Sequence, residues 1–151
     1  MLLPHSIRFS RFLKRSLLSS RLVNHLQHRC CVRQVSPRTR WQPPPADLMK
    51  INFNRAVFSS FNASSIGVVI RNNLGQVIAS CSQRLPQVYS SNEVEALAAA
   101  KAVSFAAEIG ITKAVLEGDS LTIMKALSSD HRSLSSFGLM IDDAKFSAGK
   151  L

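Results

Sequence analysis

Two acidic residues occupy positions where a carboxylate could hold a cation. Glu95 lies in the alanine-rich stretch 91–110, in the middle of the apolar arc that a helix of this sequence would present. Because a buried carboxylate without a partner is costly, its place on that arc asks for a cation, a metal ion or a helix-end role. Asp119 ends the apolar run 111–119, at the carboxyl end of an expected strand, where open α/β sheets gather ligands. Both side chains are therefore candidate metal ligands.

Each acid also has a purely structural explanation. If Asn92 caps the helix, Glu95 is its third residue and could reach back to the cap's backbone amide in a capping-box arrangement. Asp119 could cap the helix that follows it, since aspartate is common at that position. From geometry alone, capping is the more frequent role for both. Neither acid identifies a function by itself.

The elements around these acids follow a mixed α/β order. Strands are expected over residues 50–58, 65–72, 77–85 and 111–119, and helices over 91–110, 120–129 and 135–151. The turn Asn-Asn-Leu-Gly-Gln joins the second and third strands, which predicts a three-stranded antiparallel meander. Gly110 should close the first helix, and Leu121, Met124 and Leu127 recur every three residues in the second. A helical crossover then joins the meander to a parallel strand.

Charge divides the chain into two parts. The 151 residues carry a net charge of +10, and 46% of them are apolar, which allows one domain of ordinary size. Residues 1–40 hold nine basic residues and no acidic one, whereas 41–151 hold ten basic and nine acidic residues. We therefore expect a basic N-terminal tail over 1–40, a proline-rich linker over 41–48 and a folded domain over 49–151.

The tail has the composition of an organellar transit peptide, rich in arginine, serine and leucine. A helix there would place Phe9, Phe12, Leu13 and Leu17 on one arc and Arg8, Arg11 and Arg15 on another. A disordered basic arm, or translated sequence upstream of a mobile-element fragment, is the equal alternative. The sequence has no run of 18 apolar residues, which excludes a membrane span. Cys30, Cys31 and Cys81 form no metal or disulfide pattern, which favours an intracellular, reducing compartment, with a mitochondrion or plastid as the destination if the tail is a presequence.

Several motifs together resemble a ribonuclease H type 1 domain of the plant retroelement kind. WQPPPADLMKINFNRAVF is similar to the opening W-x-P-P-x…K-x-N-F-D-G-A of that family, and IGVVIRNNLGQVIAS to its second and third strands. NEVEALAAAKAV resembles the helix with the catalytic glutamate, and VLEGDS the strand end with the second aspartate. The resemblance covers residues 41–151 in the family's order. It implies an α/β fold of the RNase H type.

The resemblance implies hydrolysis of the RNA strand of an RNA-DNA hybrid by two Mg²⁺ ions held on four carboxylates. Glu95 and Asp119 match two of these carboxylates, and Asn92 matches a position that contacts the hybrid's minor groove. Asn54 stands where the family has its first aspartate, and Arg55 replaces the following glycine. The fourth carboxylate belongs to a helix after a fifth strand, and the sequence stops at Leu151 before either.

We therefore expect an RNase H-like fold without its last strand and helix, weakened Mg²⁺ binding and impaired catalysis. An amide offers one neutral oxygen and cannot bridge two cations as a carboxylate does. The expected partner is an RNA-DNA hybrid, bound by a monomer with no membrane association. A non-catalytic nucleic-acid-binding module and a retroelement-derived relic are the alternatives to a weak nuclease.

Overall fold

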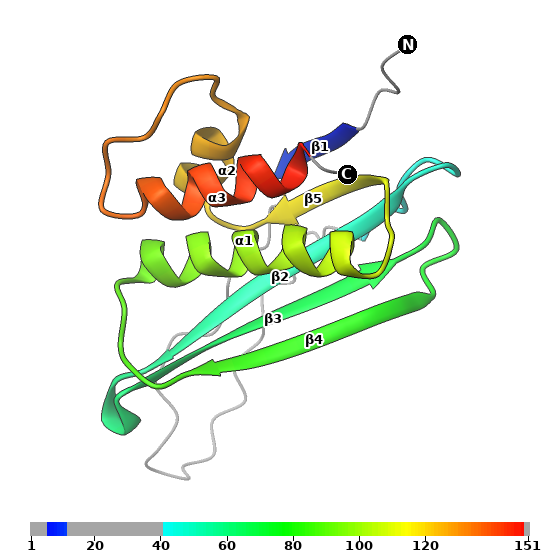
Figure 1. The fold of residues 1–151 in the computed structure, drawn as a ribbon. Coiled ribbons are helices and arrows are strands. Elements are labelled where there is room, and N and C mark those ends of the chain that lie inside the picture. Colours follow the sequence, from blue (N-terminus) through cyan, green and yellow to red (C-terminus); the bar gives the residue numbers. More distant parts are fainter. Residues whose placement is uncertain (1–5, 12–40, 150–151) are drawn as a thin grey trace, which may run out of the picture.

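The computed structural model of the chain describes residues 6–11 and 41–149. Its elements are β1 (Ser6–Arg11), β2 (Met49–Phe58), the short 3-10 helix η1 (Ser59–Phe61), β3 (Ala63–Arg71), β4 (Val77–Leu85), α1 (Ser91–Glu108), β5 (Lys113–Gly118), α2 (Leu121–Ser128) and α3 (Gly138–Ala148). The strands form one sheet in the order β1-β5-β2-β3-β4 (Figure 1). The expected mixed α/β fold is confirmed, and within the described residues α3 is the last element.

Strands β2, β3 and β4 form the predicted antiparallel meander. In β3, Ile66, Val68 and Ile70 are buried and alternate with partly exposed residues, as a strand with one covered face requires. The Asx turn between β3 and β4 is closed by Asn72, whose Oδ1 accepts hydrogen bonds from the backbone amides of Leu74 and Gln76. Gly75 supplies the positive φ of 79° that this turn needs.

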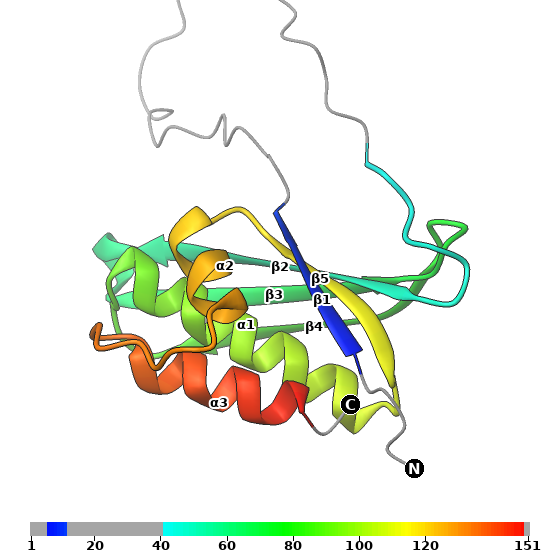
Figure 2. The same cartoon turned by 90° about the horizontal axis from the view of Figure 1, so that it is seen from above.

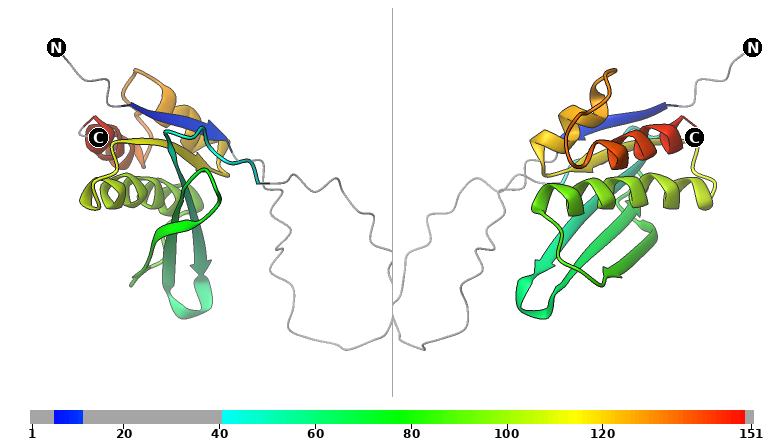
Figure 3. Two further views of the ribbon diagram at one scale, coloured as in Figure 1. Left: turned by 90° about the vertical axis from the view of Figure 1, so that its right-hand side faces the viewer. Right: turned by 60° about the vertical axis from the view of Figure 1, so that its left-hand side comes forward.

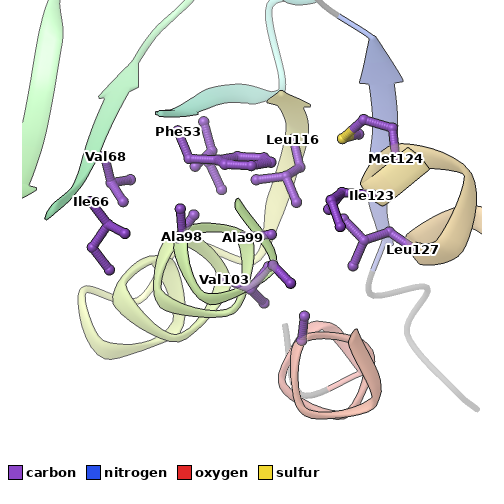
Figure 4. Close-up of a cluster of buried hydrophobic side chains, with 14 of the residues drawn as sticks. Phe53, Ile66, Val68, Ala98, Ala99, Val103, Leu116, Ile123, Met124 and Leu127 are labelled. Carbon is purple, nitrogen blue, oxygen red and sulfur yellow. The ribbon is translucent and has the colours of Figure 1, made fainter. Parts of the chain in front are cut away.

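Helix α1 crosses the sheet on β2 and β3. Its buried alanines let the helix lie close to the strands, where they meet Phe53, Ile66 and Val68 (Figure 4). Gly110, with φ of 77°, follows the helix, and the amide of Ile111 donates to the carbonyl of Ala106. The expected stop at Gly110 is thus confirmed.

All three helices cover the same face of the sheet and leave the other face open (Figure 3). Helix α3 packs against α1, and α2 packs against β1 and β5. The buried residues of α2 are Ile123, Met124 and Leu127, while Leu121 is 41% exposed, so the three-residue pattern placed Leu121 on the wrong side. Among the described residues, no helix has the length and apolar character needed to cross a membrane.

The outer edge of β5 is covered by Ser6–Arg11, a segment of the basic N-terminal tail (Figure 2). The pairing is parallel and runs from Ser6 beside Lys113 to Arg11 beside Gly118. The prediction of an amphipathic helix over 8–17 is wrong for residues 8–11, because these residues are extended. Residues 12–17 of the predicted helix lie outside the described residues.

Candidate active site

The first turn of α1 leaves Glu95 free of any capping role. Ser90 is the N-cap: its hydroxyl accepts from the backbone amide of Glu93, and the Glu93 carboxylate accepts from the backbone amide of Ser90. These hydrogen bonds lower the pKa of Glu93. The capping box is therefore two residues earlier than the one expected from Asn92 and Glu95. Glu95 has no exposed surface, and helix capping does not explain why a carboxylate is buried there.

Asp119 is likewise not a cap. Ser120 is the N-cap of α2, and its hydroxyl accepts from the backbone amide of Ile123. Asp119 follows the last residue of β5, which runs parallel to β2, as the sequence predicted. Gly118 allows close contact between these two strands, since a Cβ at this position would lie 2.3 Å from the Cζ of Phe53. Asp119 is thus held at the carboxyl end of β5 and is partly exposed.

Arg55 supplies the cation nearest to Glu95. Its Nε lies 3.2 Å from the Oε2 of Glu95, and the arginine side chain is 29% exposed. Within the described part of the chain, neither this Nε nor either carboxylate oxygen of Glu95 has a well-oriented hydrogen bond, so the contact is mainly electrostatic. Burial, and next the charge of Asp119, raise the pKa of Glu95 to about 8, and Arg55 opposes the rise. The buried carboxyl is thus incompletely compensated.

Asn54 and Asn92 are exposed, in contrast to the buried Glu95. Asn54 is exposed, and its Oδ1 accepts a hydrogen bond of 2.8 Å from the backbone amide of Arg55. Because successive side chains of a strand point to opposite faces, Asn54 belongs to the open face of the sheet and Arg55 to the face under α1. Asn92 is exposed in the first turn of α1. The structure therefore brings Glu95, Asp119 and Arg55 together, and Asn54 lines the same pocket as Asp119, whereas Asn92 is exposed on α1.

The residues at this site do not fit a pair of Mg²⁺ ions. Magnesium requires several hard oxygen ligands, and among residues 41–149 no three acidic, histidine or cysteine side chains are grouped closely enough to hold a metal. The amide oxygen of Asn54 already accepts from the backbone amide of Arg55. Arg55 places a positive charge against Glu95, where a metal ion would have to bind.

A second polar group, which the sequence analysis missed, lies on the open face of the sheet. Lys50 and Glu117 form a buried ion pair with 2.7 Å between Nζ and Oε1, and Nζ also donates to the backbone carbonyl of Gln42. Asn52 donates to the Glu117 Oε2 at 3.2 Å and accepts from the Arg71 Nη1 at 3.3 Å. Asn52 and Glu117 are direct register partners across β2 and β5. The alternation of polar residues in K-I-N-F-N and E-G-D was the sequence feature that could have predicted this polar group.

A cavity of about 880 Å³ adjoins both polar groups. Its lining includes Trp41, Asn52, Asn54, Arg71, Glu117 and Asp119. The Lys50 Nζ lies 5.2 Å from the centre of the Trp41 ring, a cation–π contact that holds the start of the segment 41–48 against the sheet. Pro44 and Leu48 of this segment are buried. The expected linker is therefore packed against the sheet, and its Trp41 lines the cavity.

Comparisons with known proteins agree with this architecture. The reverse transcriptase-like family matches residues 52–151. RNase H1 from the archaeon Halobacterium salinarum is similar to 68% of the chain and 77% of its own length, with 19% identity and a TM-score of 0.60. The N-terminal RNase H domain of rv2228c from Mycobacterium tuberculosis matches 68% of this chain and 74% of that one, with 17% identity and a TM-score of 0.59.

A third solved structure was determined with a nucleic acid. LC11-RNase H1 in complex with an RNA/DNA hybrid is similar over 68% of this chain and 75% of that one, with 16% identity and a TM-score of 0.54. No curated protein matches the sequence. At these identities the solved structures establish the fold, while the sequence match to the family covers most of the chain. The chain belongs to the reverse transcriptase-like family and has the fold of an RNase H-type domain.

Proposed function

We propose that this chain is an RNase H-like nucleic-acid-binding domain that recognises RNA-DNA hybrids and hydrolyses them poorly. The family and the fold supply the substrate class, which is also the ligand held by LC11-RNase H1. The residues of the site are the reason to expect poor catalysis. Glu95 and Asp119 keep two of the family's four carboxylate positions, and the open face beside them carries a cavity of about 880 Å³ that Asn52, Asn54 and Arg71 help to line.

The observation that carries the loss of catalysis is the contact between Arg55 and Glu95. A divalent ion at this carboxylate would have to displace a guanidinium whose Nε lies 3.2 Å away. The raised pKa of Glu95, about 8, further lowers the fraction of the charged form near neutral pH. Removing one group that stabilises transition-state charge costs enzymes roughly 10² to 10³ in rate. We therefore expect only weak binding of Mg²⁺ and little cleavage.

Restoring the family's residues should restore metal binding. In the double variant Asn54→Asp with Arg55→Gly, the Arg55 cation is gone and a third carboxylate is available. We expect its melting temperature to rise with added Mg²⁺ or Mn²⁺, and that of the unmodified chain to change little, because an ion that binds only the folded state stabilises it. Cleavage should stay low, since the described residues offer no fourth carboxylate beside these three. Asn54→Asp alone should give a smaller metal response.

Arg84→Gly is the matched control, since it removes an exposed arginine from strand β4 and should not confer a metal response. Adding Glu95→Gln to the double variant should abolish the response. Robust Mg²⁺-dependent cleavage of a hybrid by the unmodified chain, surviving Asp119→Asn, would show that the site is elsewhere. Failure to bind a hybrid would leave the retroelement relic as the better description.

The basic residues of the tail should contribute most of the non-specific affinity for nucleic acid. Residues 41–151 are almost neutral in net charge, and affinity for nucleic acids rests largely on contacts with phosphates. Replacing Lys14, Arg15, Arg21 and Arg29 by glutamine leaves β1 unchanged. A fluorescence-anisotropy titration in salt should then show weaker binding and a shallower dependence on salt concentration. Equal slopes for the two proteins would contradict this assignment.

A further inference from the structure

Strand β1 lies outside the part of the chain that the family accounts for. The family match begins at residue 52, whereas β1 comprises Ser6–Arg11. The register nevertheless continues the sheet over six residue pairs, with Ile7 beside Ala114 and Phe9 beside Leu116 (Figure 1). Ala114 and Leu116 have no exposed surface. The N-terminal segment is thus positioned against the buried part of β5.

Without β1, strand β5 would be the edge of a four-stranded sheet. Its unpaired backbone groups would be open to water and to other chains, which is the liability of an exposed edge strand. Helix α2 would also lose cover, because it packs against β1 as well as β5. The buried side chains of α2, Ile123, Met124 and Leu127, lie in the part of the core next to β1 (Figure 4). A strand at this edge therefore both pairs the backbone of β5 and helps to bury α2.

The sequence of the segment suits an edge strand. In Ser-Ile-Arg-Phe-Ser-Arg the apolar residues Ile7 and Phe9 alternate with polar ones, at the period of two that a sheet imposes. Charged residues in an edge strand discourage pairing with further chains, and Arg8 and Arg11 provide them. A parallel neighbour needs a long connection, and residues 12–112 lie between β1 and its parallel partner β5.

We propose that Ser6–Arg11 is an obligatory strand of this domain, donated by the chain to its own β5 edge. The outer edge of β5 is thus completed by a segment from the N-terminal part of the chain. The segment belongs to the working protein and is not a removable presequence, since its removal would open β5 and the core under α2. The proposal does not depend on the domain's activity.

Hydrogen exchange in the full chain tests the proposal. Adjacent residues of a strand point their amides in opposite directions, so Arg8→Pro with Phe9→Pro removes whichever of the two amides faces β5. We expect amides of Lys113–Gly118 that face β1 to exchange about tenfold faster or more, with faster exchange in α2 as well. The matched control is Leu17→Pro with Leu18→Pro, two prolines in the same tail outside β1, which should change neither element. Unchanged exchange in the first variant would overturn the proposal.

The unmodified chain gives a second measurement if the proline variant does not fold. Amides of Ser6–Arg11 should exchange more slowly than those of an unstructured peptide, and equally slowly at low and high protein concentration. Exchange at the intrinsic rate would show that the strand is absent. Protection that appears only as concentration rises, together with a dimer in analytical ultracentrifugation, would show that another copy donates the strand and would overturn the intramolecular assignment.

Discussion

Among the described residues, two ion pairs with a buried carboxylate differ in their environments. Lys50 and Glu117 are 2.7 Å apart and nearly inaccessible, and the surrounding residues complete their hydrogen bonding: Lys50 donates to Gln42 and Glu117 accepts from Asn52. Arg55 and Glu95 are 3.2 Å apart, yet among the described residues neither oxygen of Glu95 has a well-oriented donor. A satisfied buried pair holds a fold in one arrangement, whereas an unsatisfied one retains affinity for another partner.

This difference identifies the Lys50–Glu117 pair as a structural group and the Arg55–Glu95 pair as a candidate binding group. The Lys50 group connects β2, β5 and the segment 41–48, and so fixes the two strands that position Asn54, within β2, and Asp119, directly after β5. The Glu95 group has a carboxyl whose pKa is raised to about 8, a perturbation more typical of functional sites. Proteins commonly trade some stability for such groups. The following predictions test this division.

The largest effect should come from breaking the satisfied pair. Lys50→Ala leaves Glu117 buried without its cation, which should lower the free energy of unfolding by roughly 3 to 5 kcal/mol. Urea denaturation measures the loss. Replacing both partners, with Lys50→Met and Glu117→Leu, should recover most of it, because no charge is then left buried. A loss below about 1 kcal/mol for Lys50→Ala would mean that water solvates Glu117 and that the pair is not structural.

The Arg55–Glu95 pair should make the stability of the protein depend on pH. The pKa of Glu95 is raised from 4.5 to about 8, so between these values the folded protein holds a proton that the unfolded chain has lost. Stability should therefore be fully present below pH 4.5 and fall as pH rises toward 8, by at most about 1.4 kcal/mol per pH unit. Glu95→Gln should remove this slope and be more stable than the unmodified chain at pH 8.

Thermal unfolding of both proteins across this pH range isolates the contribution of Glu95, because all other titrating groups are shared. A difference in stability that does not change with pH would mean that the carboxyl stays ionised in the folded protein. Glu95→Gln would then only remove the attraction to Arg55, and it should be the less stable of the two at every pH.

The smallest effect concerns the start of α1 and distinguishes capping residues from exposed ones. Ser90→Ala removes the N-cap hydroxyl and should cost about 1 kcal/mol of stability. Asn92→Ala, in the same turn, should leave stability nearly unchanged and weaken hybrid binding if the family's contact is kept. Thermal unfolding and anisotropy with a labelled hybrid separate the two effects. A clear loss of stability in Asn92→Ala would return a structural role to this residue.

Local patterns in the sequence were sufficient for the meander, for the alanine-rich helix and for the position of Asp119. Strand periodicity, the turn at Asn72 and the stop at Gly110 depend on residues close together in the chain, so they can be recognised without the fold. The capping box at Ser90 and Glu93 has an equally local signature, S-x-x-E. Asn92 and Glu95 offer a similar pattern two residues later, because asparagine is itself a common cap residue.

The contacts that define the site were decided only by the tertiary structure. Lys50 meets Glu117, and Arg55 meets Glu95, through strand register and through the passage of α1 over β2. The N-terminal segment is likewise extended as β1, where it pairs with the edge of β5 and packs against α2. Its own pattern of arginine and leucine residues favoured a helix. Residue types and their local spacing thus determined the elements and the two retained carboxylates. Which charges neutralise one another depends on distances between residues far apart in the chain, and these exist only once the chain has packed.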